Sequence, residues 1–207
     1  GADGLKIIDI SNPKIPTTVG SYLTGSPAAA QAVVVAGGYA YVADSNTGLN
    51  VIDISNPASP TLASSTTAFG RAFRIALSGK YLFMPDSLTA TMWLVDISNP
   101  YAPATVGSYV TDSVNGSIYA VAVSGKYAYI GDQGTNLVYI VNVSNPASTT
   151  LVGKYGPTNV TAPTGLYASS KYLYMTDSSK GFSILNVSNP ASITRTGFFG
   201  ASSNYYG

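Results

Sequence analysis

Apolar and polar residues alternate in short stretches along the chain, and Gly, Asn and Pro interrupt them at regular distances. Between Ala30 and Thr67, "AQAVVVAGG" ends in glycines, "YAYVADSNTG" ends in a turn, "LNVIDISNPASP" ends in a proline turn, and "TLASSTT" is more polar. β-Branched and aromatic residues in alternation predict strands, and Gly, Asn and Pro predict the turns between them. No window has a convincing helical period. The pattern therefore predicts four consecutive strands.

This unit recurs along the chain. Its most regular part reads "KIIDISNPKIP" at Lys6, "NVIDISNPASP" at Asn50, "WLVDISNPYAP" at Trp93, "YIVNVSNPAST" at Tyr139 and "SILNVSNPASI" at Ser183. The motif aspartate, or the asparagine that replaces it, recurs at intervals of 44, 43, 46 and 44 residues. A period of this length with four strands per unit is typical of a β-propeller blade.

These residues resemble the LVIVD repeat family, which is named for a strand such as "NVIDISNP". The resemblance rests on G-x-Y-a-Y-v-x-D, G-L-x-[IV]-[IV]-D-[IV]-S-N-P and V-G-S-Y at fixed offsets, and it covers nearly the whole chain. "VGSY" is present at Val19 and Val106 and drifts to "VGKY" at Val152 and "TGFF" at Thr196. The resemblance implies a β-propeller, usually in a secreted or surface protein, and it implies no single activity.

We therefore expect one all-β domain over residues 1–207, a β-propeller of four-stranded antiparallel blades with about five repeats, four full and one partial. The expected parts are a half blade (1–24), four blades (28–68, 70–112, 117–156 and 163–198) and a tail (199–207). The half blade contains only the last two strands of a unit. Further chain, or a neighbouring copy pairing with the open edge, would complete it. Head-to-tail pairing of copies would build a filament.

The composition indicates which classes of partner and which cellular location to expect. Charged residues make up 9% of the chain, and the net charge of +1 comes from scattered basic residues, so we expect no nucleic-acid partner. The longest apolar stretch, from Ala28, contains Gln31 and a Gly pair, and is too short and broken to insert in a membrane as a helix. The polar but uncharged composition favours a secreted or cell-surface protein.

The usual parts of an active site are missing. The chain has no Cys and no His, and all nine acidic residues are Asp. Ser-His-Asp and Cys-His arrangements and His-based metal sites are therefore excluded. Only Asp112, in "TDSVNGS", lies off the repeat, so paired carboxylates would have to come from scaffold positions. We expect a non-enzymatic protein without a cofactor, and keep a hydrolase or lyase using Asp112 and Arg74 as the least favoured alternative.

Two series of acidic or amide residues are expected to be structural. At the motif position three units carry Asp and two carry Asn, which share a hydrogen-bond acceptor but not a charge, so they should accept hydrogen bonds in turns rather than bind metal. These residues are Asp9, Asp53, Asp96, Asn142 and Asn186. A second series ends the Tyr-rich strands and comprises Asp44, Asp86, Asp132 and Asp177. Turn acceptors are expected there too, with calcium binding as the alternative because "DSNTG" gathers oxygen donors.

Four residues are candidates for contact with a ligand or partner. Arg74 aligns with small residues of the innermost strand, and should project into or over the central channel to bind an anion or a glycan, unless it faces solvent or pairs with an aspartate. Trp93 and Tyr139 occupy the same position of the repeat, which varies between units. We expect this variable slot to be exposed, so that the two side chains form a patch that contacts sugar or protein. Asp112 is the fourth candidate, because it lies off the repeat.

Two further features concern packing and modification. Tyrosines spaced by two, such as Tyr39 and Tyr41, share one sheet face and should pack between blades. Asn115 and Asn159 lie in loops and are the candidate glycosylation sites. Together these observations favour a structural or adhesive propeller that contacts other proteins, including copies of itself. A glycan- or small-ligand-binding propeller is the alternative.

Overall fold

The computed structural model describes residues 2–25, 28–156 and 162–200, and all regular elements within them are strands. No helix in this part of the chain is long and apolar enough to cross a membrane. The strands are β1 (Leu5–Asp9), β2 (Thr17–Tyr22), β3 (Ala30–Ala36), β4 (Tyr39–Asp44), β5 (Gly48–Asp53), β6 (Thr61–Thr66), β7 (Ala76–Ser78), β8 (Tyr81–Asp86), β9 (Thr91–Asp96), β10 (Ala104–Val110), β11 (Ile118–Ser124), β12 (Tyr127–Asp132), β13 (Leu137–Asn142), β14 (Thr150–Tyr155), β15 (Pro163–Ala168), β16 (Tyr172–Asp177), β17 (Gly181–Asn186) and β18 (Thr194–Gly200).

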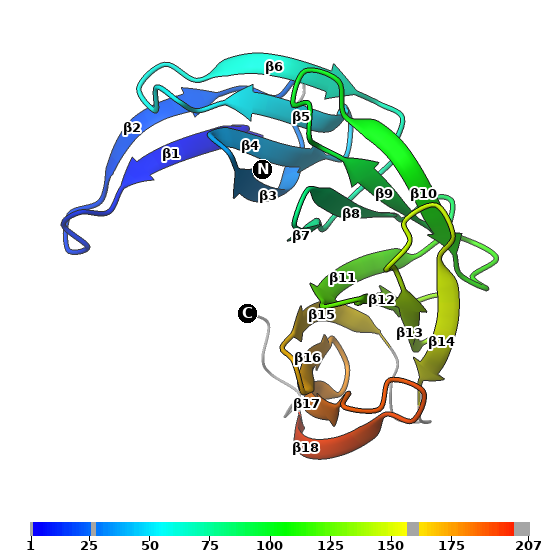
Figure 1. The fold of residues 1–207 in the computed structure, drawn as a ribbon. Helices are drawn as coiled ribbons and strands as arrows, with labels where there is room; N and C mark the ends of the chain where they lie inside the picture. Colours follow the sequence, from blue (N-terminus) through cyan, green and yellow to red (C-terminus); the bar gives the residue numbers. More distant parts are fainter. Residues whose placement is uncertain (1, 26–27, 157–161, 201–207) are drawn as a thin grey trace.

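The strands form one two-stranded and four four-stranded antiparallel sheets, in which neighbours follow one another in sequence. We call β1–β2 the half blade, and β3–β6, β7–β10, β11–β14 and β15–β18 blades 2 to 5. The sheets follow one another along an arc, with the first strand of each full blade toward its centre and the last strand outside (Figure 1). The half blade and blade 5 lie at the two ends of this arc, and no strand of the described residues joins them. The molecule is an open β-propeller.

Each inner blade buries both of its faces, because alternate side chains of a strand point to opposite sides. We call the side toward the next blade the forward face and the side toward the previous blade the rear face. In β5, Leu49 and Val51 lie on the forward face and pack with Leu82 of blade 3. Ile52 lies on the rear face and packs with Leu5 of the half blade. The core is therefore a series of layers between blades.

The proline turns after the motif strands contain the hydrogen bonds that the sequence predicts. In each turn the side-chain oxygen of the motif residue accepts a hydrogen bond from the backbone N–H two residues later. The donors are Ser11 for Asp9, Ser55 for Asp53 and Ser98 for Asp96, each at 2.8 Å, and Ser144 for Asn142 and Ser188 for Asn186, each at 3.0 Å. Asn serves as well as Asp because both carry the acceptor.

The strand-end aspartates are buried acceptors as well. Oδ2 of Asp44 accepts from the Thr24 hydroxyl at 2.6 Å and from the Ala29 N–H at 2.9 Å, and Oδ1 accepts from the N–H groups of Asn46 and Thr47. Burial raises the pKa of Asp44, but these hydrogen bonds outweigh burial and leave the pKa below its usual value. The donors occupy both carboxylate oxygens, which favours a structural role over calcium binding.

Candidate functional site

The structure brings two of the four candidate contact residues together. The Tyr139 hydroxyl donates to Oδ2 of Asp112 at 3.4 Å, and Lys154 makes an ion pair with the same carboxylate. The Lys154 ammonium also lies 5.0 Å from the centre of the Tyr139 ring. The hydrogen bond from Lys154 is the main reason why the pKa of Asp112 is lowered. Lys154 was not among the candidates, and its sequence signal is the change from V-G-S-Y to V-G-K-Y.

The expected exposure of the variable slot is wrong. Tyr139 is fully buried and packs with Phe83 and Met92 between blades 3 and 4. Trp93 is half-buried and packs on the cluster between blades 2 and 3. The slot lies on the rear face of the motif strand, where the preceding blade covers it. Because the two side chains belong to different interfaces, they do not form the shared surface patch that the sequence suggests.

Arg74 is exposed and precedes the shortened inner strand of blade 3. The strand β7 has 3 residues, whereas β3 has 7, and it begins only after Arg74. Pro85 of the neighbouring strand lacks the N–H that a residue there would otherwise offer. The Arg74 guanidinium donates to the backbone carbonyl of Phe73 at 3.1 Å, and no aspartate among the described residues forms an ion pair with it. Its contact with an anion or glycan stays a prediction.

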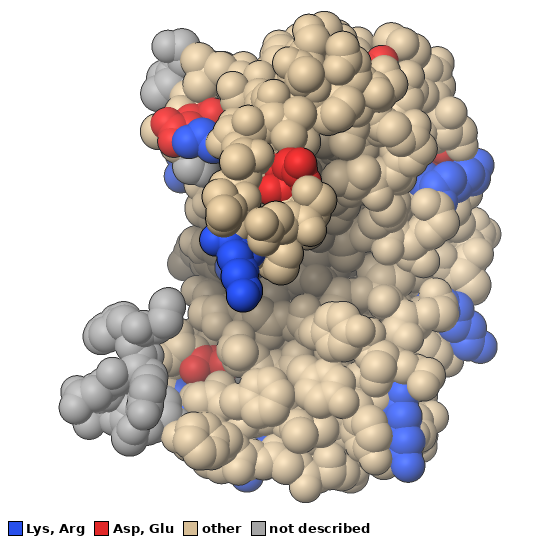
Figure 2. Space-filling view, turned by 90° about the vertical axis from the view of Figure 1, so that its left-hand side faces the viewer, with Lys and Arg blue, Asp and Glu red and all other residues tan. Residues whose placement is uncertain are grey.

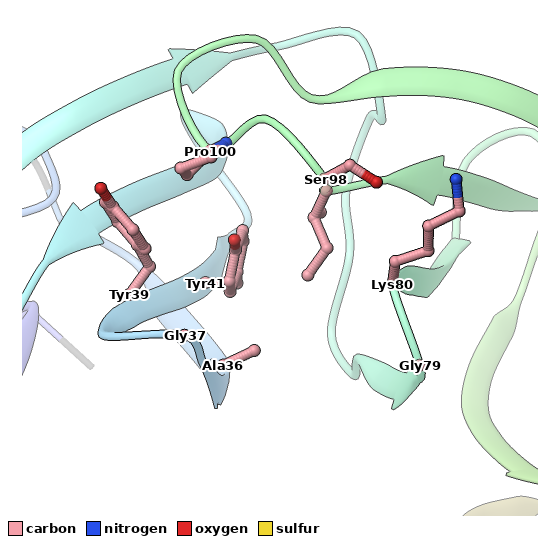
Figure 3. Close-up of a pocket in the computed structure, with 9 residues that line it drawn as sticks. Ala36, Gly37, Tyr39, Tyr41, Gly79, Lys80, Ser98 and Pro100 are labelled. Carbon is pink, nitrogen blue, oxygen red and sulfur yellow. The ribbon is translucent and has the colours of Figure 1, made fainter.

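A pocket of about 310 Å³ lies between blades 2 and 3, and the sequence did not single it out. Tyr39 and Tyr41 project from β4 on one side, Lys80 and Ser98 lie on the other, and Pro100 lies above them (Figure 3). The packing of the tyrosine pair between blades was predicted, and both rings do contact the cluster between blades 2 and 3. The pocket itself depends on two turns of blade 3 coming beside them, which no local pattern reveals.

Hydrogen bonds link several ionisable groups around this pocket. The hydrogen bond between the Tyr39 and Tyr101 hydroxyls, at 3.4 Å, is the main cause that raises the pKa of Tyr39 to about 12. Lys80 lies 2.7 Å from Oδ2 of Asp96, which lowers the pKa of Asp96 to about 2 and raises that of Lys80. These shifts move the pKa values of Tyr39, Asp96 and Lys80 further from neutral pH.

The forward face of blade 5 carries exposed aromatic side chains. Phe199 is 70% exposed and Tyr167 is 69% exposed, and the Tyr174 and Phe182 rings stack between them with an interplanar angle of 17°. Tyr155, which holds the position of Phe199 in blade 4, is buried. Figure 2 looks into the open side of the arc; it shows a hollow between the upper and lower parts, and the charged groups of the lower part, which contains blade 5, lie toward its edges.

Three of the four sequon asparagines lie in the described part of the chain, and they differ in their exposure and in their hydrogen bonds. Asn115 is exposed in the loop before β11. Asn159 lies outside the described residues. At the two other sequons, Asn142 and Asn186, the side-chain oxygens are used by the turns. Only Asn115 therefore combines a sequon with an exposed position in the described part of the chain.

The fold and its surface define an open β-propeller built from one repeated unit. The LVIVD repeat model matches residues 1–24, 27–68, 69–111, 115–156 and 164–199, and the chain belongs to this repeat family. A comparison with curated proteins found no match.

Several solved structures share this fold. A functionally unknown protein from Desulfotomaculum acetoxidans has a TM-score of 0.76 and 17% identity, over 97% of this chain and 64% of its own. A candidate 6-phosphogluconolactonase from Bacteroides uniformis has a TM-score of 0.75 and 14% identity, over 91% of this chain and 61% of its own. The computationally designed Ika4 protein has a TM-score of 0.63 and 12% identity, over 80% of this chain and 95% of its own. This chain thus spans less than two thirds of the two natural proteins, and at these identities the likeness concerns the fold alone.

Proposed function

We propose that this protein is a non-enzymatic contact module, secreted or held at the cell surface, that binds another protein through the forward face of blade 5. The observation that carries the proposal is the exposure of Phe199 and Tyr167 on one sheet face, at positions where other blades are covered. Contiguous exposed apolar groups mark interaction surfaces, and aromatic side chains supply much of the energy of protein interfaces.

The chemistry of the chain supports contact rather than catalysis. It has no His, Cys or Glu, and the pKa values of Asp96 and Tyr39 lie far from neutral. An extracellular location is supported by the low charge, the abundance of Ser, Thr and Asn, and the exposed sequon at Asn115.

Photo-crosslinking tests this proposal in the full-length protein made by its own organism. A benzophenone amino acid replaces Phe199, and in a control it replaces Leu88, which is also well exposed but lies in the loop between β8 and β9. We expect crosslinks to protein from position 199 and not from position 88. Absence of any protein crosslink at position 199, or the same products from both positions, would overturn the proposal.

A second candidate function is the binding of a neutral sugar or another small ligand. The observation that favours it is the pocket between blades 2 and 3, whose volume and mixture of tyrosine rings with Lys80 and Ser98 suit such a ligand. Glycan-array binding that is lost in Tyr39→Ala but retained in Tyr167→Ala would support it. The same array with Arg74→Ala and Trp93→Ala tests the residues that the sequence suggested. No binding to any glycan by the wild type would remove the glycan form of this function.

A further inference from the structure

Every internal interface between blades contains the same contact between a proline turn and an outer strand. A methyl group on Gly20, in the outer strand of the half blade, would overlap the carbonyl oxygen of Pro57, in the turn of blade 2. The equivalent pairs are Gly107 with Pro146, Gly153 with Pro190 and, in blade 2, Ser64, whose hydroxyl donates to the Pro100 carbonyl at 2.7 Å. A small residue on the outer strand therefore receives the turn of the next blade four times in succession.

The two ends of the arc carry the unused halves of this contact. Gly197 pairs with Ile184 in blade 5 as Gly20 pairs with Ile7 in the half blade, so it occupies the position that receives a turn. The three atoms nearest to a methyl group there all belong to the side chain of Ile184 in its own blade, and none belongs to a turn. At the other end, the proline turn with Pro13 is exposed. Blade 5 thus offers a receiving strand, and the half blade offers a turn.

The apolar side chains at the two ends match in the same way. Ile8 is 51% exposed and Ile10 is 70% exposed, whereas Ile52, the equivalent of Ile8 in blade 2, is 0% exposed. Between the half blade and blade 2, the forward pair Leu5 and Tyr22 packs near Ile52 and Ile54. The equivalents at the ends are the forward pair Phe182 and Phe199, and the rear pair Ile8 and Ile10. The same apolar contact is available at both ends, and the described residues make it at neither.

We propose that the partner of blade 5 is the half blade of a second copy of this chain. The turn with Pro13 of one copy then seats on Gly197 of the next, and Ile8 and Ile10 cover Phe182 and Phe199. This inference rests on the proposed contact function and names its partner. The two surfaces differ from each other, so the contact leaves one free end on each copy and continues into a linear assembly.

Two variants with one blocked end each test this arrangement. Phe199→Asp blocks blade 5 but keeps the half blade, and Ile10→Asp blocks the half blade but keeps blade 5. By sedimentation velocity we expect the wild type to associate as its concentration rises, and each variant alone to stay monomeric. An equimolar mixture should form dimers and nothing larger, because each pair leaves only blocked ends. Leu88→Asp is the matched control and should associate like the wild type.

A smaller change tests the turn contact itself. Gly197→Ala adds one methyl group where the Pro13 turn would seat, and should weaken association at least about tenfold while the variant stays folded by circular dichroism. Wild-type protein that remains monomeric up to millimolar concentration would overturn the proposal. Dimers of Ile10→Asp alone would also overturn it, because they would join two blade 5 faces.

The crosslinking experiment separates this inference from the proposed function. A crosslink from position 199 to the half blade of another copy supports both. A crosslink to a different protein keeps the contact function and refutes self-pairing. A crosslink within one chain refutes self-pairing and shows that further residues of the same chain cover the face. No protein crosslink refutes both.

Discussion

Blade 2 and the half blade contain the same repeat, yet they differ in how much of it is buried. The motif strand reads "NVIDIS" in blade 2 and "KIIDIS" in the half blade, and both strands form the same bulged pairing with an outer strand. Ile52 is nevertheless fully buried, while Ile8 is half exposed. The difference comes from the neighbours and not from the local sequence, since only blade 2 has a sheet on each side.

This comparison teaches that a blade of this protein does not bury its own core. Each sheet provides two apolar faces, and a neighbour must cover each of them, as in other repeat proteins. We therefore expect the end sheets to be the least stable parts of the described chain. The predictions below test this comparison from the largest expected effect to the smallest.

The largest difference is expected when the same substitution is made at Ile52 in blade 2 and at Ile8 in the half blade. Ile52→Ala removes a fully buried side chain between two sheets and should lower the free energy of unfolding by about 2–5 kcal/mol. Ile8→Ala removes a half-exposed one and should cost about 1 kcal/mol or less. Urea denaturation at low protein concentration measures both, so that association does not contribute. Equal losses would show that Ile8 is covered within the single chain.

A pair of glycines tests the turn contact between blades. Gly107→Ala places a methyl group against the Pro146 carbonyl, where backbone has to move, and should cost about 1–3 kcal/mol. The methyl group of Gly197→Ala has the flexible side chain of Ile184 as its nearest neighbour, and should change stability by no more than about 0.5 kcal/mol. Thermal unfolding of the two variants is the measurement. A large loss in Gly197→Ala would mean that position 197 already receives a turn.

Hydrogen exchange compares the two sheets without mutation. A two-stranded sheet is marginal in water by itself, and the half blade packs against a neighbouring sheet on one side only. We therefore expect the backbone amides of β1 to exchange at least about tenfold faster than those of β5. Deuterium uptake of peptides over residues 5–9 and 48–53 measures this difference. Protection of residues 5–9 that rises with protein concentration would indicate pairing with a second copy. Equal protection at high dilution would contradict the comparison.

The repeat predicted the strands and turns because both depend on short-range rules. The fixed offsets predicted four strands per blade. The exchange of Asp53 for Asn142 at the same position predicted a hydrogen-bond acceptor whose charge is not needed. Both predictions need only alternation and turn chemistry. The short inner strand of blade 3 lies beside Pro85, and a missing N–H in one strand affects the strand next to it, which is not a short-range rule.

The candidate site was harder to predict, because it depends on which blades meet. Variation at the slot of Trp93 and Tyr139 suggested exposure, but a rear-face position is covered by the preceding blade, and differing neighbours accept differing side chains. The pocket beside Tyr39 forms with two turns of blade 3 that lie forty or more residues further along the chain. The one sequence signal near this pocket is Tyr101 in "NPYAP", where other repeats have "NPASP" or a similar run.

The smallest expected effect compares the turns of blades 2 and 3. Asp96 pairs with Lys80, whereas Asp53 has Gly38 in the corresponding turn and only the Ser55 group as donor. The pKa of Asp96 should therefore be about 2 by carboxyl carbon NMR, and it should rise toward that of Asp53 in Lys80→Ala. The folded-state pKa lies below the unfolded value of about 3.9, so the pair stabilises the fold above that pH, and the stabilisation is lost as the pH falls toward 2. Because the pair is exposed, Asp96→Asn should reduce stability at neutral pH only slightly, as the Asn142 and Asn186 turns imply. An unchanged Asp96 titration in Lys80→Ala would assign the low pKa to Ser98 alone, and would make the two turns electrostatically equivalent.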